Sequence, residues 1–229
     1  MVRPAPSSSR TADARKGTTT AVAEHLKNRV RRGSLAPGQR LVEVDIMQET
    51  GASRGRVREA LRQLASEGIV IIEAYRGASV RRLSRDDVDQ IYRAREALEG
   101  AAARLFAERL QPAQLQQVQA LQAQMDACES SGDREAYGLL NDRWHALILR
   151  ACGNSYVEVF VERLRLPIFR LQFSMFYSGE AMRLSNAGHR KVTSAITAGD
   201  GDAAETEMRA HIREGLSAIG DSDDEFFAN

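Results

Sequence analysis

Apolar residues recur at helical spacing near the start of the chain. Val22, Leu26 and Val30 are each four residues apart, so they share one face of a helix that we predict over 19–32. After a turn that contains a Pro-Gly pair, a shorter helix is predicted over 44–50 and ends at a glycine. The chain therefore opens with two helices joined by a turn.

A third helix follows, and its apolar residues are separated from its basic ones. Ser53 is a natural N-cap residue, and Gly68 ends the helix. The apolar face comprises Val57, Leu61 and Leu64. Arg58 and Arg62 project on the opposite side, and Arg54 lies at the N-terminal end, where a recognition helix meets base edges and phosphates. This arrangement predicts a DNA-reading helix.

Two short predicted strands then surround a glycine-containing turn. The runs cover 69–73 and 78–82, and the turn covers 74–77, which predicts a β-hairpin with a basic tip. Three helices followed by a hairpin is the order of elements in a winged helix-turn-helix, whose wing would touch the DNA backbone or minor groove. A small α+β domain with an arginine-rich surface is the alternative, but it leaves the separation of the arginines from the apolar face unexplained.

The rest of the chain shows helical periodicity and essentially no strand signal. Glycines at 132, 153, 179, 199 and 201 separate candidate helices over 86–108, 111–130, 133–151, 155–176, 180–198 and 202–219. The predicted fold is mainly α, with an N-terminal winged helix-turn-helix and a C-terminal all-α helical bundle. We expect a disordered basic arm over 1–17, a DNA-binding domain over 18–83, a helical effector-binding and dimerisation domain over 84–219, and an acidic tail over 220–229.

Charge divides the chain at about the same place. The net charge is +1, but residues 1–85 contain 17 Lys and Arg against 8 Asp and Glu, whereas residues 86–229 contain 15 against 23. A basic half joined to an acidic half is what a DNA-binding module fused to a different module would show, because phosphate neutralisation needs clustered Lys and Arg. A merely solvated basic surface is the alternative.

Other sequence features narrow the class of protein. The longest apolar stretches are far shorter than the roughly 20 residues that span a bilayer, so we expect no membrane partner. The polar, basic N-terminus lacks the apolar segment of a secretory signal. Cys128 and Cys152 share no C-x-x-C spacing and fit a reducing cytoplasm, in which the protein would be associated with the nucleoid when bound to DNA.

Three of the four histidines have spacings that would bring them together on packed helices. Asn141 and His145 are four residues apart, so they lie one above the other on one helix face. The sequence Gly-Asp-Gly at 199–201 marks a break between two helices. His189 lies eleven residues before Asp200, at the centre of this break, and His211 lies eleven residues after it. If this break closes an antiparallel hairpin, both histidines lie about 16 Å along their helices from the turn and are level with each other.

These side chains form a candidate metal site. Three imidazoles and an amide oxygen suit a divalent ion such as zinc, nickel, manganese or iron, with positions left open for water or an anionic ligand. The alternative is that each histidine is separately an ordinary core or surface residue, which is the interpretation kept for His25 on the first helix. The joint spacing of the other three favours a metal-centred pocket.

The N-terminal motifs resemble those of the GntR family of bacterial transcription factors, specifically the FadR branch with a helical FCD effector domain, over about residues 18–219. The sequence reads PGQRL at 37–41, ASRGRVREALRQLASEGI at 52–69 and RGASV at 76–80. The resemblance implies that DNA is contacted by Ser53, Arg54, Arg58 and the wing residue Gly77. Gly55 and Arg56 stand where the family usually has Thr-Pro, so a threonine contact is lost and Arg56 is gained.

The C-terminal half resembles the FCD domain of the same family. REALE at 95–99 is similar to the family's R-x-x-L-E, and NDRWHALILRACGN at 141–154 is similar to its D/N-x-x-F-H motif with a following G-N. The resemblance assigns metal ligation to Asn141, His145, His189 and His211. It also suggests Arg95 as a partner of an effector's carboxylate. A glutamate often precedes the third ligand in the family, but here the residue is Gly188.

The sequence thus predicts a homodimeric transcriptional regulator, more specifically a repressor, of bacterial type. It would bind pseudopalindromic double-stranded operator DNA and respond to a small organic acid effector. A metal-dependent enzyme with a three-histidine site is a rival class, but no H-E-x-x-H or other convincing general base accompanies the histidines. A DNA-binding protein with a purely structural metal is a third class.

Overall fold

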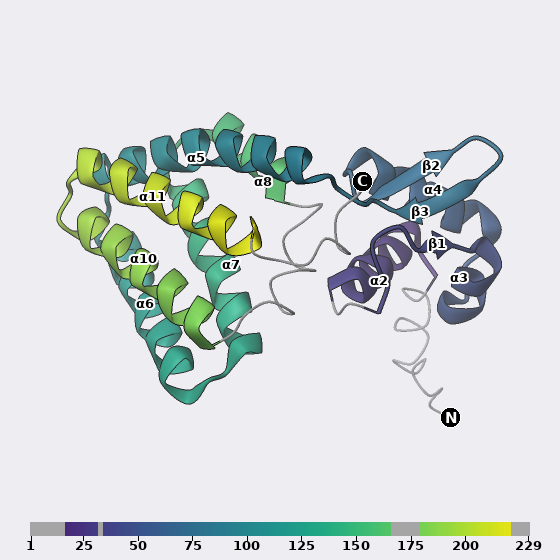
Figure 1. The fold of residues 1–229 in the computed structure, drawn as a ribbon, viewed down its shortest axis with the longest axis horizontal. Coiled ribbons are helices and arrows are strands. Elements are labelled where there is room, and N and C mark those ends of the chain that lie inside the picture. Colours follow the sequence, from purple (N-terminus) through teal and green to yellow (C-terminus); the bar gives the residue numbers. More distant parts are fainter. Residues whose placement is uncertain (1–16, 32–33, 166–178, 221–229) are drawn as a thin grey trace, which may run out of the picture. The chain divides into compact units, whose positions relative to one another are not determined.

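The computed structural model of the protein has two compact units, which divide between Arg82 and Leu83 (Figure 1). It describes residues 17–31, 34–165 and 179–220. Three predicted features lie outside these residues: the basic arm apart from Gly17, the end of the helix expected over 155–176, and the acidic tail after Gly220.

The first unit contains the three predicted helices. They are α2 (Thr19–Arg31), α3 (Glu43–Thr50) and α4 (Arg54–Ser66). α2 and α3 both pack against α4. The spacing of apolar residues explains this packing, since Val22 and Leu26 of α2 and Val57 and Leu64 of α4 are all buried. α3 ends at Gly51, whose φ of 68° lies in the left-handed region that glycine adopts without strain.

A small antiparallel sheet completes this unit. Its strands are β1 (Arg40–Leu41), β2 (Val70–Glu73) and β3 (Gly77–Val80), in the order β1-β3-β2. The hairpin of β2 and β3 is the predicted wing, with Glu73 paired to Gly77 at its tip. β1 was not predicted, because a two-residue strand carries no alternating pattern and exists only through its pairing with β3.

The second unit consists of helices in its described residues, which confirms the all-α bundle. They are α5 (Arg85–Glu108), α6 (Pro112–Ser131), α7 (Arg134–Ala151), α8 (Ser155–Arg165), α10 (Gly179–Thr197) and α11 (Gly201–Gly220). Local signals set their ends. Ser84 and Asp87 form a capping box at the start of α5, and the Asp133 side chain accepts from the Ala136 N–H at the start of α7.

The helices of this unit surround a core of large side chains. α11 packs along α5, and α10 packs against α11 and α6, so that α10 and α11 form the expected antiparallel hairpin (Figure 1). The core includes Phe106, Met125, Tyr137, Trp144, Ile148 and Met208. Among the described residues, no helix is apolar over a length that would cross a membrane.

Candidate nucleic-acid interface and metal centre

The predicted DNA-contact residues lie on the exposed side of the first unit. Ser53, Arg54, Arg56 and Arg58 are exposed at the start of α4, and Gly77 is exposed at the start of β3. Ser53 occupies the N-cap position, but its side chain makes no capping hydrogen bond. The opposite side of α4 is buried, so the helix is fixed to its unit by one face and presents arginines on the other.

Glu43 of α3 holds two of these arginines. Its Oε1 accepts a hydrogen bond from Arg58 Nε at 2.7 Å, and its Oε2 lies 3.3 Å from Arg54 Nε. Both arginine side chains are more than half exposed, so these ion pairs contribute little to stability. Their main effect is to orient the two guanidinium groups side by side. Sequence reasoning missed Glu43, which no spacing rule connects to α4.

Arg56 has a different environment from its neighbours. Its Nη1 donates to the backbone carbonyl of Gly17 at 3.0 Å, which joins the start of α4 to the segment that leads into α2. Gly55, beside it, has no heavy atom within 4 Å of a Cβ built at that position. The two residues that depart from the family's usual Thr-Pro therefore fit this fold without displacing other groups.

In the second unit, the structure brings three of the predicted ligands together. His145 comes from α7, His189 from α10 and His211 from α11, and one ligand atom from each lies within 4.8 Å of the others. The ring centroids of His189 and His211 are 4.3 Å apart, and His145 lies 5.5 and 5.4 Å from them. All three rings are buried. Asn141 lies one turn before His145 on α7 and is half-buried.

A buried ion pair fixes the ring of His145. Glu99 Oε2 lies 2.7 Å from His145 Nδ1, and Glu99 Oε1 accepts a hydrogen bond of 2.7 Å from Arg95 Nε. Burial is the largest single influence on Arg95 and opposes its charge, but the interactions with Glu99 and Tyr92 together outweigh it and raise the pKa of the guanidinium. An ionised carboxylate accepts only, so His145 Nδ1 carries the proton and Nε2 is left as the nitrogen that can ligate.

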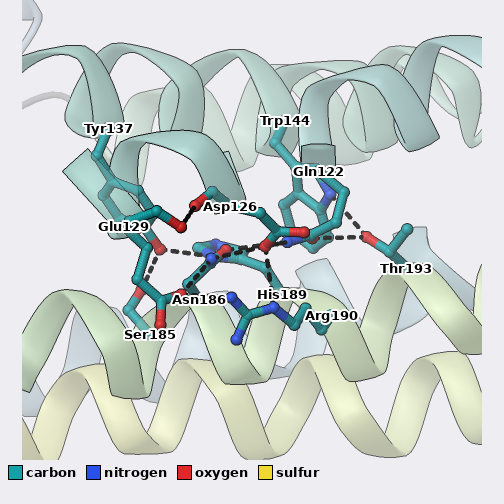
Figure 2. Close-up of polar contacts among 11 residues, drawn as sticks. Gln122, Asp126, Glu129, Tyr137, Trp144, Ser185, Asn186, His189, Arg190 and Thr193 are labelled. Carbon is teal, nitrogen blue, oxygen red and sulfur yellow. Dashed lines mark hydrogen bonds and ion pairs between the residues drawn. The ribbon is translucent and has the colours of Figure 1, made fainter. Parts of the chain in front are cut away.

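A tyrosine fixes the ring of His189. The Tyr137 hydroxyl lies 3.0 Å from His189 Nδ1 and donates to Ser185 Oγ at 3.3 Å (Figure 2). Burial raises the pKa of Tyr137, so the hydroxyl stays protonated. The tyrosine oxygen is placed to accept a proton from His189 Nδ1, and in that tautomer Nε2 is available for ligation, as in His145.

His211 differs from the other two histidines. Its Nδ1 is buried and has no hydrogen-bond partner among the residues that the structure describes. Burial, and after it the neighbouring His145, lower the pKa of His211 to about 3, so the ring is neutral at pH 7. A Cβ at Gly188 of α10 would lie 2.6 Å from this nitrogen. The glycine is therefore what allows His211 to approach α10 so closely.

Trp144 forms an aromatic wall beside the cluster. Its ring centroid lies 5.0, 4.6 and 6.3 Å from those of His145, His189 and His211. The indole Nε1 donates to Thr193 Oγ1 at 3.0 Å, and Thr193 donates to Gln122 Oε1. Figure 2 shows that this series of hydrogen bonds continues from Gln122 through Asn186 to the ion pairs of Arg190 with Asp126 and Glu129. The network ties α6, α7 and α10 together around the tryptophan.

These residues fit a divalent metal ion. They offer imidazole nitrogens from three helices, and His211 is in the neutral form that ligates a metal ion. The other two rings are oriented by partners on Nδ1, as metal-bound histidines commonly are. A buried Nδ1 without a partner is costly in a protein core unless an ion or water satisfies it. The sequence identified the three histidines, but it assigned no role to Glu99 or Tyr137, although Glu99 follows Arg95 by one helical turn within the REALE motif.

A winged helix that presents arginines, followed by a helical bundle with a buried histidine cluster, defines the class of two-domain DNA-binding regulators. The chain belongs to the GntR family of bacterial regulatory proteins. Residues 18–80 match the description "Bacterial regulatory proteins, gntR family", and residues 90–214 match the FCD domain. Members of this family are transcriptional regulators.

Relatives named as transcriptional repressors align with most of the chain. It is 27% identical over 215 residues to a probable D-xylose utilization operon transcriptional repressor of Paenarthrobacter nicotinovorans, with 92% of this chain and 94% of the relative covered. It is 29% identical over 181 residues to the HTH-type transcriptional repressor RspR of Escherichia coli strain K12, with 79% of each covered. The solved structure of E. coli McbR/YncC shares the fold, with a TM-score of 0.76 at 22% identity over 88% of this chain and 96% of that one.

Proposed function

We propose that this protein is a transcriptional repressor that binds a pseudopalindromic operator as a homodimer and responds to a small carboxylate effector. The observation that carries the proposal is the combination, in one chain, of an exposed arginine face on α4 with a buried three-histidine cluster in a separate unit. The repressor assignment is supported by relatives that are named as repressors.

The proposed DNA contacts are Ser53, Arg54, Arg56, Arg58 and Gly77. Their support is their exposure at the start of α4 and of β3, since N-terminal residues of a recognition helix reach base edges in the major groove. Replacing Arg54 or Arg58 with Ala should reduce operator preference, by about 1 to 3 kcal/mol for a base-edge contact. Unchanged preference for operator over random DNA in both variants would remove these residues from the interface.

The proposed metal ligands are Asn141, His145, His189 and His211. A bound zinc, nickel, manganese or iron ion would supply a Lewis acid that can hold a carboxylate oxygen. The protein's own residues do the rest: Glu99 and Tyr137 orient two rings, and Trp144 covers the cluster. Arg95 is the proposed partner of the effector's carboxylate, supported by its charge and by its burial beside Glu99.

One titration series tests this function. Trp144 is the chain's single tryptophan and lies against all three rings, so its fluorescence should change when Zn²⁺ or Ni²⁺ is added to chelator-treated protein. DNA duplexes selected by the protein from a random-sequence pool would then be used to measure affinity with lactate, malonate or citrate present. A metal that binds without any carboxylate altering DNA affinity would favour the structural-metal alternative. Turnover of these acids by the metal-loaded protein would favour an enzyme.

The homodimer is proposed to form mainly through the helical unit. A two-fold operator requires two winged helices related by two-fold symmetry. The helical half of the chain is acidic and is not expected to contact DNA itself, so holding the two copies together is the part it can play in DNA binding. Light scattering should give a dimer for the whole chain and for a fragment that starts near Ser84. A monomeric helical fragment together with a dimeric N-terminal fragment would contradict this arrangement.

A further inference from the structure

A groove of about 300 Å³ lies between α6 and α10 of the helical unit. Sites for small organic ligands span about 300 to 1,000 Å³, so the groove has room for one small molecule. Its lining is mostly polar and includes Gln119, Gln122 and Asp126 of α6 and Arg190, Thr193 and Ser194 of α10. The histidines of the cluster are not part of this lining, so the groove is a separate feature from the proposed metal centre.

A buried glutamine fixes the inner side of the groove. Gln122 is 7% exposed, and its Nε2 donates to Asn186 Oδ1 at 2.9 Å and to Asp126 Oδ1 at 3.0 Å. Its Oε1 accepts a hydrogen bond of 3.2 Å from Thr193 Oγ1 (Figure 2). The amide cannot turn without breaking these bonds. A ligand would therefore meet groups that are already ordered, which lowers the entropy cost of binding.

The outer side of the groove carries groups that the protein does not use. Gln119 and Ser194 are exposed, and their side chains make no hydrogen bond to any residue that the structure describes. A carboxamide and a hydroxyl can each donate and accept. A ligand hydroxyl has the same double capacity, so it can pair with either side chain whichever way its proton points.

The charges at the groove are already compensated within the protein. Arg190 Nε donates to Asp126 Oδ1 at 2.9 Å, and Arg190 Nη2 pairs with Glu129. The same two carboxylates also accept hydrogen bonds from Asn186. A carboxylate ligand would have to displace an acid from the arginine, and an ammonium ligand would have to displace the arginine from the acids. A neutral ligand needs neither exchange.

We propose that the groove between α6 and α10 is a second ligand site, which binds a small neutral polyhydroxy compound of the size of one monosaccharide or cyclic polyol. Such a compound presents hydroxyl groups around a ring, and the carboxamides and hydroxyls of the lining match them in number and in kind. The described lining contains no aromatic side chain, so a flat aromatic ligand would find no ring on which to stack. The proposal depends neither on the metal nor on DNA binding.

Thr193 connects the groove to the chain's single tryptophan. Trp144 Nε1 donates to Thr193 Oγ1 at 3.0 Å, and the hydroxyl in turn donates to Gln122. An indole N–H can only donate, so the direction of this series is fixed. A ligand hydroxyl that binds Gln122 or Thr193 changes the surroundings of the indole hydrogen bond. Trp144 fluorescence should therefore report occupancy of the groove.

Titration calorimetry of the full chain with D-xylose, D-glucose and myo-inositol tests the proposal. We expect saturable binding of at least one of these compounds at one site per chain, with a change in Trp144 fluorescence that has the same midpoint. Gln119→Ala and Ser194→Ala should each weaken binding about two- to tenfold, the effect of one hydrogen bond. Their melting temperatures should not change. Gln124→Ala, an exposed glutamine of α6 outside the groove, is the matched control and should bind as the wild type does.

A variant that fills the groove tests its location. Ala123 lines the groove, and Ala123→Phe adds a ring there without removing a hydrogen bond, so it should abolish sugar binding and leave Zn²⁺ affinity unchanged. Undiminished sugar binding in this variant would overturn the assignment of the site. Absence of saturable binding for all three compounds would overturn the proposal, even if sugars raise the melting temperature in proportion to their concentration, because exclusion from the protein surface has that effect. Sugar binding without any Zn²⁺ binding would contradict the metal centre instead.

Discussion

Glu99 and His145 form a hydrogen bond that is almost completely shielded from water. Glu99 Oε2 lies 2.7 Å from His145 Nδ1, and the two side chains are 1% and 4% exposed. The bond joins α5 to α7, and Arg95 neutralises the carboxylate from the other side. This relationship fixes which nitrogen of His145 faces the cluster, and the first prediction follows from it.

Glu99→Gln should weaken metal binding without removing any proposed ligand. The amide can no longer act as a charged acceptor for His145 Nδ1, and loss of such a partner typically reduces metal affinity about 10- to 100-fold. Zn²⁺ titration followed by Trp144 fluorescence measures the change. Glu96→Gln, on the same helix but paired with Arg213 instead, is the matched control and should bind as the wild type does. Equal affinities in the two variants would contradict a role for Glu99.

Gly188→Ala should displace His211 and lower metal affinity. The new Cβ would lie 2.6 Å from His211 Nδ1, closer than van der Waals contact allows, so the ring or α10 must move. Thermal melts with and without Zn²⁺ report the effect, since metal that binds the folded state raises the melting temperature. Gly138→Ala on α7 meets no atom within 4 Å and serves as the control. A metal-dependent shift equal to that of the control would show that the cluster tolerates the extra methyl group.

The metal-free protein should become less stable as the pH falls below neutrality. His211 has a pKa of about 3 in the folded state against an ordinary 6.5, so below pH 6.5 the unfolded chain binds a proton that the folded chain does not. The contribution of neutral, buried His211 to the free energy of unfolding is complete above pH 6.5. It is lost as the pH falls toward 3, at up to about 1.4 kcal/mol per pH unit. Urea unfolding at pH 7 and pH 5 measures it. His211→Leu should show a smaller loss, and an identical loss would assign the effect to other groups.

Glu43→Gln should change DNA recognition more than protein stability. Removing the carboxylate releases Arg54 and Arg58 from a shared partner and makes the surface more positive, so affinity for random DNA should rise while the preference for selected duplexes falls. Competition binding at fixed salt measures both quantities. Glu59→Gln, on α4 but bonded to Thr19, is the control. A parallel rise for random and selected DNA would mean that Glu43 affects charge alone and does not orient the arginines.

The sequence by itself determined the elements and their order. Helical and strand periodicity depends on local steric and solvent effects, so the three helices, the wing and the bundle could be predicted. The proximity of His189 and His211 was also predictable, because two residues equally far from the turn of an antiparallel helical hairpin lie at the same level on its two helices. The GntR motifs identified the family from residues close together in the chain.

Only the tertiary structure decided how these elements meet. Strand β1 arises from pairing with β3, and the bond of Glu43 to Arg58 joins two helices whose separation in sequence carries no signal. Glu99 and Tyr137 acquire their roles because helix packing brings them to particular ring nitrogens of His145 and His189. Such contacts depend on the orientation of neighbouring helices to within about an ångström, and a pattern of hydrophobic positions specifies which faces are buried but not that orientation.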